Sequence, residues 1–136
     1  MAKYVLVEPK ILINGTNLSD HIAQVTLGEE VADVTTTAFG SRGVTRIAGL
    51  EDSSITLAFH QDFAAASVDV TLSPLVGTLA TVVVTPQGTA AASATNPVYS
   101  AVCLVTQYSP IDGSVGDLAT FNVTWPISGT VTRSTA

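Results

Sequence analysis

The residues best suited to chemistry in this sequence are its two histidines, His21 and His60, each of which has acidic neighbours. Asp20 precedes His21, and Asp62 follows His60 by two positions. With a serine, such residues can supply a Ser-His-Asp hydrolytic set, and they can also ligate a metal ion. However, no G-x-S-x-G turn presents a serine, and two histidines without a tight ligand spacing are a weak metal signal. We therefore interpret both histidines as residues at strand ends.

The remaining candidates for chemistry lead to the same conclusion. Glu29 and Glu30 lie at a turn, where a solvated pair is expected rather than an acid-base catalyst, because nothing predicts burial of either carboxylate. Gly40 and Gly43 precede no helix that could present amide groups to a phosphate. Cys103, the only cysteine, lies in an apolar stretch and is predicted to be a small buried residue. The sequence therefore predicts no enzyme, cofactor or metal site.

The composition points to a protein that is covered by other protein. The 136 residues are enough for one domain, residues 1–136, with one core. Hydrophobic residues make up 46 %, but charged residues only 12 %, about half the usual share. The net charge of −6 disfavours a surface that grips nucleic acid. No apolar run is long enough to span a membrane, and the first ten residues do not resemble a signal peptide, so we expect cytoplasmic synthesis and no membrane partner.

Alternating apolar residues predict strands along most of the chain. The clearest is 54–61, where Ile55, Leu57 and Phe59 share one face. A helix is favoured only within 62–75, where three alanines follow a capping Asp62. Because helices do not alternate with the strands, we predict an antiparallel β-sandwich or barrel with one short helix. The other predicted strands are 3–7 (with 10–13 as a second piece), 22–27 with Ala23, Val25 and Leu27 on one face, 31–37, 78–85, 98–108, 118–125 and 130–133.

The sequence also predicts the structure of two connections between strands. Asn14-Gly15 is a tight-turn signal. Residues 87–95 are small and low in complexity and predict a mobile loop, which the Asn96-Pro97 turn ends.

The feature that most needs an explanation is a long loop at 37–52, between the strands 31–37 and 54–61. Loops of this length without structure of their own are uncommon and usually functional. This one contains two of the five basic residues of the chain and several apolar side chains, so we expect it to leave its own sandwich and pack on a neighbouring subunit. The residues expected in that contact are Phe39, Arg42, Val44, Arg46, Ile47 and Leu50.

The order of these parts resembles the tail tube (major tail) proteins of long-tailed bacteriophages. The resemblance covers residues 13–133 and is carried by three segments. It implies a small β-sandwich with one helix, hexameric rings that stack into a tube, and a channel through which DNA passes during ejection. It also implies that the long loop reaches the next ring, and that the protein is located in the virion tail. The segments are INGTNLSDHIAQVTLGEEVADVTTTAFGSRGVTRIAGLEDSSITLAFHQDF, AAASVDVTLSPLVG and SPIDGSVGDLATFNVTWPISGTVTR.

This resemblance further implies that the partners are other copies of the chain and tail proteins such as the tape measure, tip and terminator. We expect Glu29, Glu30 and Asp33 to line the channel, because an acidic wall lets phosphate pass without binding. Two alternatives stay open. One is a different virion structural module, such as a head decoration protein or an immunoglobulin-like tail appendage. The other is a small hydrolase or binding protein.

Overall fold

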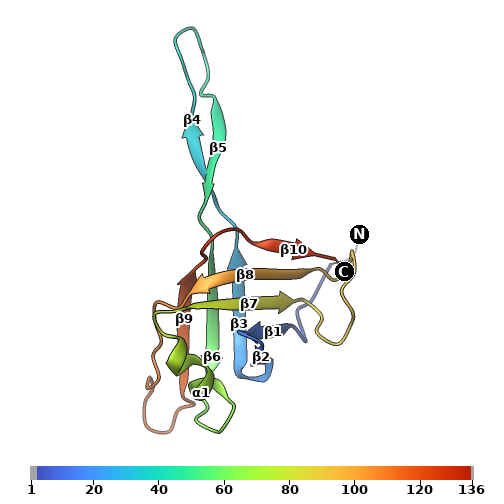
Figure 1. Ribbon diagram of the computed structural model, residues 1–136, viewed down its shortest axis with the longest axis vertical. Coiled ribbons are helices and arrows are strands. Elements are labelled where there is room, and N and C mark those ends of the chain that lie inside the picture. Colours follow the sequence, from blue (N-terminus) through green and yellow to red (C-terminus); the bar gives the residue numbers. More distant parts are fainter. Residues whose placement is uncertain (1–2, 136) are drawn as a thin grey trace.

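The computed structural model describes residues 3–135, which form two packed sheets and one long projecting hairpin (Figure 1). The strands in chain order are β1 (Lys10–Ile13), β2 (Thr16–Asn17), β3 (Ile22–Gly28), β4 (Val31–Thr35), β5 (Arg46–Glu51), β6 (Ser54–His60), β7 (Leu79–Thr85), β8 (Val98–Leu104), β9 (Thr120–Pro126) and β10 (Thr132–Ser134). The helical elements are the 3-10 turn η1 (Ser19–His21), the α-helix α1 (Val68–Leu72) and the 3-10 turn η2 (Ser73–Leu75).

The two sheets of the body are both antiparallel. One has the strand order β10-β8-β7-β1-β2 and the other the order β3-β6-β9. In Figure 1 the strands β6 and β9 follow the long axis of the molecule, whereas β7 and β8 run across it. The predicted antiparallel sandwich with one short helix is confirmed. Within the described residues the sheets remain open and do not close into a barrel.

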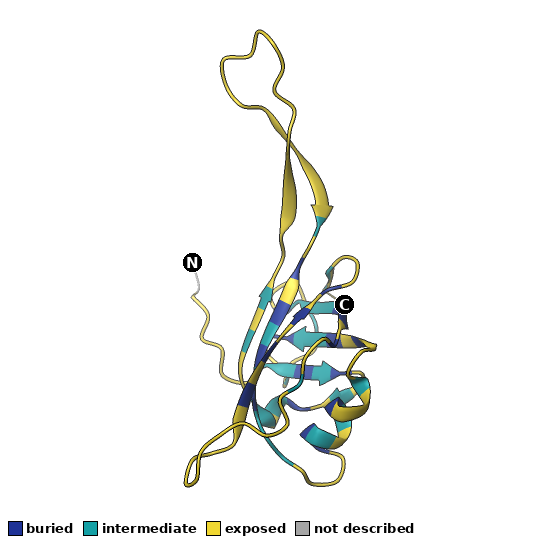
Figure 2. Cartoon of the chain, turned by 90° about the vertical axis from the view of Figure 1, so that its left-hand side faces the viewer, coloured by how far each residue is buried: buried dark blue, intermediate teal, exposed yellow. Residues whose placement is uncertain are grey.

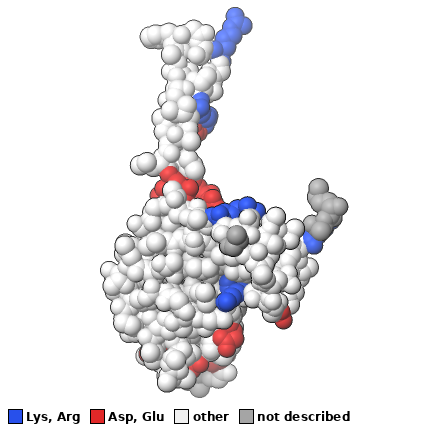
Figure 3. Space-filling model, turned by 45° about the vertical axis from the view of Figure 1, so that its right-hand side comes forward, with Lys and Arg blue, Asp and Glu red and all other residues white. Residues whose placement is uncertain are grey.

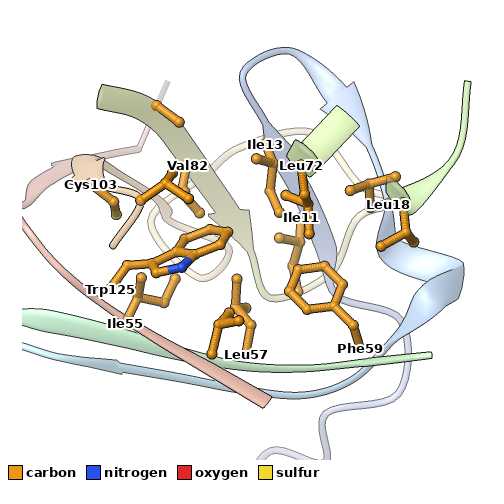
Figure 4. Close-up of a cluster of buried hydrophobic side chains, with 14 of the residues drawn as sticks. Ile11, Ile13, Leu18, Ile55, Leu57, Phe59, Leu72, Val82, Cys103 and Trp125 are labelled. Carbon is orange, nitrogen blue, oxygen red and sulfur yellow. The ribbon is translucent and has the colours of Figure 1, made fainter. Parts of the chain in front are cut away.

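The core lies where the two sheets cross. Its buried side chains come from the inner faces of both sheets, from α1 and from the residue before η1, and include Ile11, Ile13, Leu18, Ile55, Leu57, Phe59, Leu72, Val82, Cys103 and Trp125 (Figure 4). The alternation predicted for 54–61 is confirmed, since Ile55, Leu57 and Phe59 are buried. The ring of Phe59 stacks on that of Phe121, and the indole nitrogen of Trp125 donates to the Gln107 carbonyl at 3.0 Å. The buried indole therefore leaves no polar atom unsatisfied.

Cys103 lies in this core as predicted and forms no disulfide. Burial raises the pKa of its thiol to about 11, because the thiolate would lose its hydration there. The residue behaves as a small apolar side chain.

The helix is confirmed within 62–75 but is shorter than the alanine cluster predicted. Ala66 has a φ of 56°, in the left-handed region, so the alanines form a turn and not a helical stretch. Asp62 caps this turn, because its carboxylate accepts from the Ala64 amide at 2.9 Å and from the Ser67 hydroxyl at 2.7 Å. The α-helix then begins at Val68.

Three predicted strands differ in the structure. Residues 3–7 pair with no other strand, although the Tyr4 hydroxyl donates to the Pro86 carbonyl at 2.7 Å. The strand predicted over 98–108 ends at Leu104. On β3, Val25 and Leu27 pack on the core as predicted, but a bulge between Ile22 and Gln24 puts Ile22 on the core as well and leaves Ala23 exposed.

Of the two predicted connections, the turn is as expected and the loop is not. Asn14 and Gly15 have φ of 52° and 89° and form the tight turn between β1 and β2, as predicted. The segment 87–95, predicted to be a mobile loop, instead folds around buried Asn96. The Asn96 amide donates to the carbonyls of Gln87, Ala90 and Ala91, and its oxygen accepts from the Gln87 amide.

Candidate assembly surfaces

The hairpin that projects from the body, formed by β4, β5 and the connecting residues 36–45, is called the arm (Figures 1 and 2). Its strands pair in antiparallel register, with Thr35 opposite Arg46 and Val34 opposite Ile47. Every residue of β4 and all but the last of β5 are exposed. The arm is therefore ordered by its own backbone ladder, not by packing on the body.

The structure corrects the expected loop at 37–52. Its second half, Arg46–Glu51, is a strand, and only residues 36–45 connect the two strands of the arm. The sequence reading missed this strand because Gly49 interrupts its β pattern. In the structure Gly49 is needed for close packing, since an added Cβ would lie 2.9 Å from Val34 Cγ2 and 3.2 Å from Ala32 Cβ.

The residues predicted to contact a neighbouring subunit are all on the arm and are all exposed. Phe39, Arg42 and Val44 lie in the connection, which we call the tip. Ile47 and Leu50 lie on β5, and Leu50 is 85 % exposed. The tip is held by the hydrogen bond from the Thr36 hydroxyl to the Thr45 hydroxyl, at 2.8 Å. These apolar side chains are more than half exposed and remain available to another molecule.

The charges of the arm are partly paired within it. Arg46 forms an ion pair with Asp33 across the two strands, and both side chains are about half exposed. An exposed pair of this kind contributes little to stability, about 0–1 kcal/mol. The structure thus brings together Arg46, predicted to meet a neighbour, and Asp33, predicted to line a channel. Among the described residues Arg42 has no acidic partner.

Acidic residues gather where the arm joins the body (Figure 3). Glu29 and Glu30 connect β3 to β4, Glu51 ends β5, and Asp52 lies in the connection from β5 to β6. The Asp52 amide donates to the Glu30 carbonyl at 2.8 Å, which closes the base of the arm. Glu51 also accepts from the Val131 amide at 2.9 Å, so the base is tied to the body next to β10.

His21, Asp62 and a serine lie close together in the structure, but they are not hydrogen-bonded in the sequence that a Ser-His-Asp catalytic set requires. His21 lies between two carboxylates, with Nδ1 2.9 Å from Asp20 Oδ1 and Nε2 2.9 Å from Asp62 Oδ2. The buried Ser67 hydroxyl donates to Asp62 and not to the histidine. A nucleophilic serine needs the imidazole as its proton acceptor. The geometry instead links η1 to the segment that precedes α1.

The second histidine does not join this cluster. His60 Nδ1 is buried and has no hydrogen-bond partner within residues 3–135. No group of three or more His, Cys, Asp and Glu side chains in that part of the chain is arranged to hold a metal ion. No helix among the same residues is long and apolar enough to cross a membrane.

One exposed apolar region was not anticipated. The connection between β8 and β9, residues 105–119, carries exposed Ile111, Val115 and Leu118, and Phe63 is exposed beside it. The sequence reading treated part of this segment, SPIDGSVG, only as a turn. The available signal was the presence of large apolar residues among glycine, serine and aspartate.

The fold matches chains from two solved phage-like particles. One is described as the virion of a native gene transfer agent (GTA) particle, with a TM-score of 0.71, 15 % identity and coverage of 93 % of this chain and 95 % of that chain. The other is the tail of an empty GTA particle with C6 symmetry, with a TM-score of 0.66, 15 % identity and coverage of 91 % and 95 %. No family model and no curated protein matches the sequence.

At this identity the likeness shows the fold alone. The resemblance to phage tail proteins that the sequence suggested is confirmed at that level: the chain has the fold of a tail or virion chain of a GTA particle, over nearly its whole length.

Proposed function

We propose that this protein is a tail tube subunit of a phage or phage-like particle, located in the virion tail. Its copies form hexameric rings that stack into a tube, and DNA passes through the tube during ejection. The single observation that carries this proposal is the arm, an ordered hairpin that has no buried residue in β4 and carries exposed apolar side chains on both strands and at the tip.

The energetics of the arm favour a binding role. Ordering a residue costs about 1–2 kcal/mol of backbone entropy. Burial of a large apolar side chain such as Phe39 or Leu50 contributes about 1.5–3 kcal/mol. When a partner covers the arm, the free energy of apolar burial is not offset by the cost of ordering the hairpin, because β4 and β5 already pair. Copies of the same chain in an adjacent ring are the partner that the tube requires.

Other features support the ring and the channel. The matching GTA tail has C6 symmetry. The sandwich leaves the edges of the sheet β3-β6-β9 open, and neighbours in a ring can cover such edges. The net charge of −6 disfavours DNA binding, as a conducting channel requires. Glu29, Glu30 and Asp33 remain our candidates for the channel wall, and of these Asp33 is paired with Arg46 within the arm.

The remaining parts of the proposal follow from the resemblance to tail tube proteins. The further partners would be the tape measure, tip and terminator proteins, and synthesis would occur in the host cytoplasm. We propose no enzymatic activity, which the hydrogen bond from Ser67 to Asp62 in place of His21 supports.

The test of assembly uses a shortened arm. Because Thr35 and Arg46 are paired directly, an Asn-Gly turn can replace residues 36–45 without a change of strand register. We expect the wild-type protein to form rings and tubes in negative-stain images. The shortened variant should keep the thermal unfolding temperature of the wild type but form no tubes. A wild-type chain that stays monomeric at all concentrations and salt levels would contradict the proposal.

The test of DNA passage is separate. Tubes of a Glu29→Lys, Glu30→Lys double variant should retain DNA in a filter-binding assay at low salt, whereas wild-type tubes should not. Equal retention by both would exclude these two residues from the channel wall. A variant with the same change of charge at Glu8 and Asp20, two exposed positions away from the arm, serves as the control.

A further inference from the structure

A second unpartnered apolar surface lies at the end of the body away from the arm. A cleft of about 310 Å³ opens between Phe63 and residues 110–119 of the connection between β8 and β9. Phe63, Pro110, Ile111 and Val115 supply its apolar wall. In Figure 1 both segments are at the bottom of the molecule, and the arm leaves from the top.

The two sides of the segment that lines the cleft are anchored to the body by specific hydrogen bonds. The Gln61 side-chain amide donates to the Tyr108 hydroxyl at 3.0 Å and to the Pro110 carbonyl at 2.7 Å. The Gln61 backbone amide donates to the Ala119 carbonyl at 2.9 Å. One residue at the end of β6 thus ties both ends of the connection.

The start of the connection is anchored further by Tyr108. Its hydroxyl donates to Asp69 Oδ1 at 2.7 Å, and its ring packs edge-on against Phe121. Despite this anchoring, Ile111 and Val115 are 89 % and 106 % exposed. A fixed loop that presents large apolar side chains to water marks an interaction site.

The cleft and the arm tip are complementary in chemistry. The cleft contains two carboxylates, Asp112 and Asp117, beside its apolar wall. The tip carries the fully exposed ring of Phe39 and, as its one charge, Arg42. With the Phe39 ring on the apolar wall and the Arg42 guanidinium near the two carboxylates, a single contact would bury the apolar side chains and pair the charges.

We propose that the cleft receives the arm tip of a second copy of this chain. The inference rests on the proposed function and names the surface to which the arm binds. Because arm and cleft lie at opposite ends of one molecule, the contact joins unlike surfaces. A contact between unlike surfaces can repeat from copy to copy, and because these two surfaces lie at opposite ends of the long axis, it adds copies along that axis, as stacking of rings requires.

The first test is an exchange of charges. Arg42→Glu alone, and Asp112→Lys with Asp117→Lys, should each lower the yield of tubes by about ten-fold or more, because like charges then meet in a desolvated contact. The combination of all three substitutions should restore most of the yield. Glu8→Lys with Asp20→Lys, at two exposed positions away from the cleft, makes the same change of net charge as the Asp112 and Asp117 pair and is the control for that variant. Failure of the combined variant to recover would contradict the pairing of these groups.

The second test uses two defective variants together. Phe39→Asp damages the tip and keeps the cleft, while Ile111→Asp damages the cleft and keeps the tip. Neither should form tubes alone. An equimolar mixture should form complexes of twice the size of either component in analytical ultracentrifugation, because one intact tip and one intact cleft remain. Circular dichroism and thermal unfolding verify that each variant is folded.

The outcomes separate this inference from the proposed function. If wild-type protein forms tubes and Ile111→Asp does so equally well, the cleft is not the receptor although the tube function stands. If the mixture pairs but wild-type protein forms no rings or tubes, the contact stands and the tube function fails. No pairing in the mixture overturns the inference.

Discussion

Nε2 of His21 lies 2.9 Å from Oδ2 of Asp62, so a side chain of η1 is joined to the residue that caps the turn before α1. The same carboxylate accepts from the Ala64 amide and the Ser67 hydroxyl. A single ionised group therefore organises the region where the helical segment meets the sheet β3-β6-β9.

The first prediction concerns pH. The Ala64 backbone N–H, with the Ser67 hydroxyl and His21, lowers the pKa of Asp62 below its ordinary value of 3.8. A carboxyl whose pKa is lowered by folding stabilises the protein above its unfolded pKa, and this contribution is lost as the pH falls through the folded pKa. We expect the free energy of unfolding, measured in urea, to decrease on acidification below about pH 4, and Asp62→Asn to reduce that decrease.

Asp20→Asn is the matched control for this prediction, because the Asp20 side chain also contacts His21 but is 81 % exposed. It should leave the acid dependence close to that of the wild type. An Asp62→Asn variant with an unchanged acid dependence would show that Asp62 does not carry it.

The second prediction concerns Gly49 in the arm. Gly49→Val places its Cβ against Val34 and Ala32 and should distort the hairpin. Since the arm is exposed, the body should unfold at the same temperature as in the wild type, while tube formation decreases. The control is Gly43→Ala in the tip, where an added Cβ meets nothing within 4 Å. A normal yield of tubes from Gly49→Val would show that assembly does not depend on the shape of the hairpin.

The third prediction concerns Asn96. Asn96→Ala removes four hydrogen bonds of a buried side chain and leaves backbone groups of 87–91 without partners. The expected loss of stability is about 2–4 kcal/mol, since each such bond contributes about 0.5–1.5 kcal/mol. Denaturant unfolding measures it. Ser93→Ala, in the same loop and exposed, should cost less than about 0.5 kcal/mol.

The fourth prediction concerns Gln61. Gln61→Leu removes both side-chain hydrogen bonds that tie the connection 105–119. We expect faster amide hydrogen exchange across 109–118 and a higher protein concentration for tube assembly, because the cleft is no longer held in one shape. Gln87→Leu, at an exposed position far from the cleft, is the control. Unchanged exchange would mean that the connection is ordered without Gln61.

The alternation of apolar residues was sufficient to predict the sandwich. In β6 and β9 one face is buried in a core, and burial with a period of two leaves a direct mark on the sequence. The same holds for the Asn14-Gly15 turn, whose residues are selected by the positive φ of both positions. The apolar residues of 37–52 are also where the sequence placed a surface without a partner in its own sandwich, and they are exposed on the arm, whereas assembly through them stays a prediction.

The arm and the cleft were decided by tertiary structure. Both faces of β5 are exposed, so no alternation marks it, and only its register against β4 makes it a strand. The cleft lies between Phe63 and residues near position 115, which are far apart in the chain. The hydrogen bonds from Gln61 to Tyr108 and Pro110 likewise connect distant positions. Pairing of distant segments depends on how the whole sandwich packs, and no local pattern of residues encodes it.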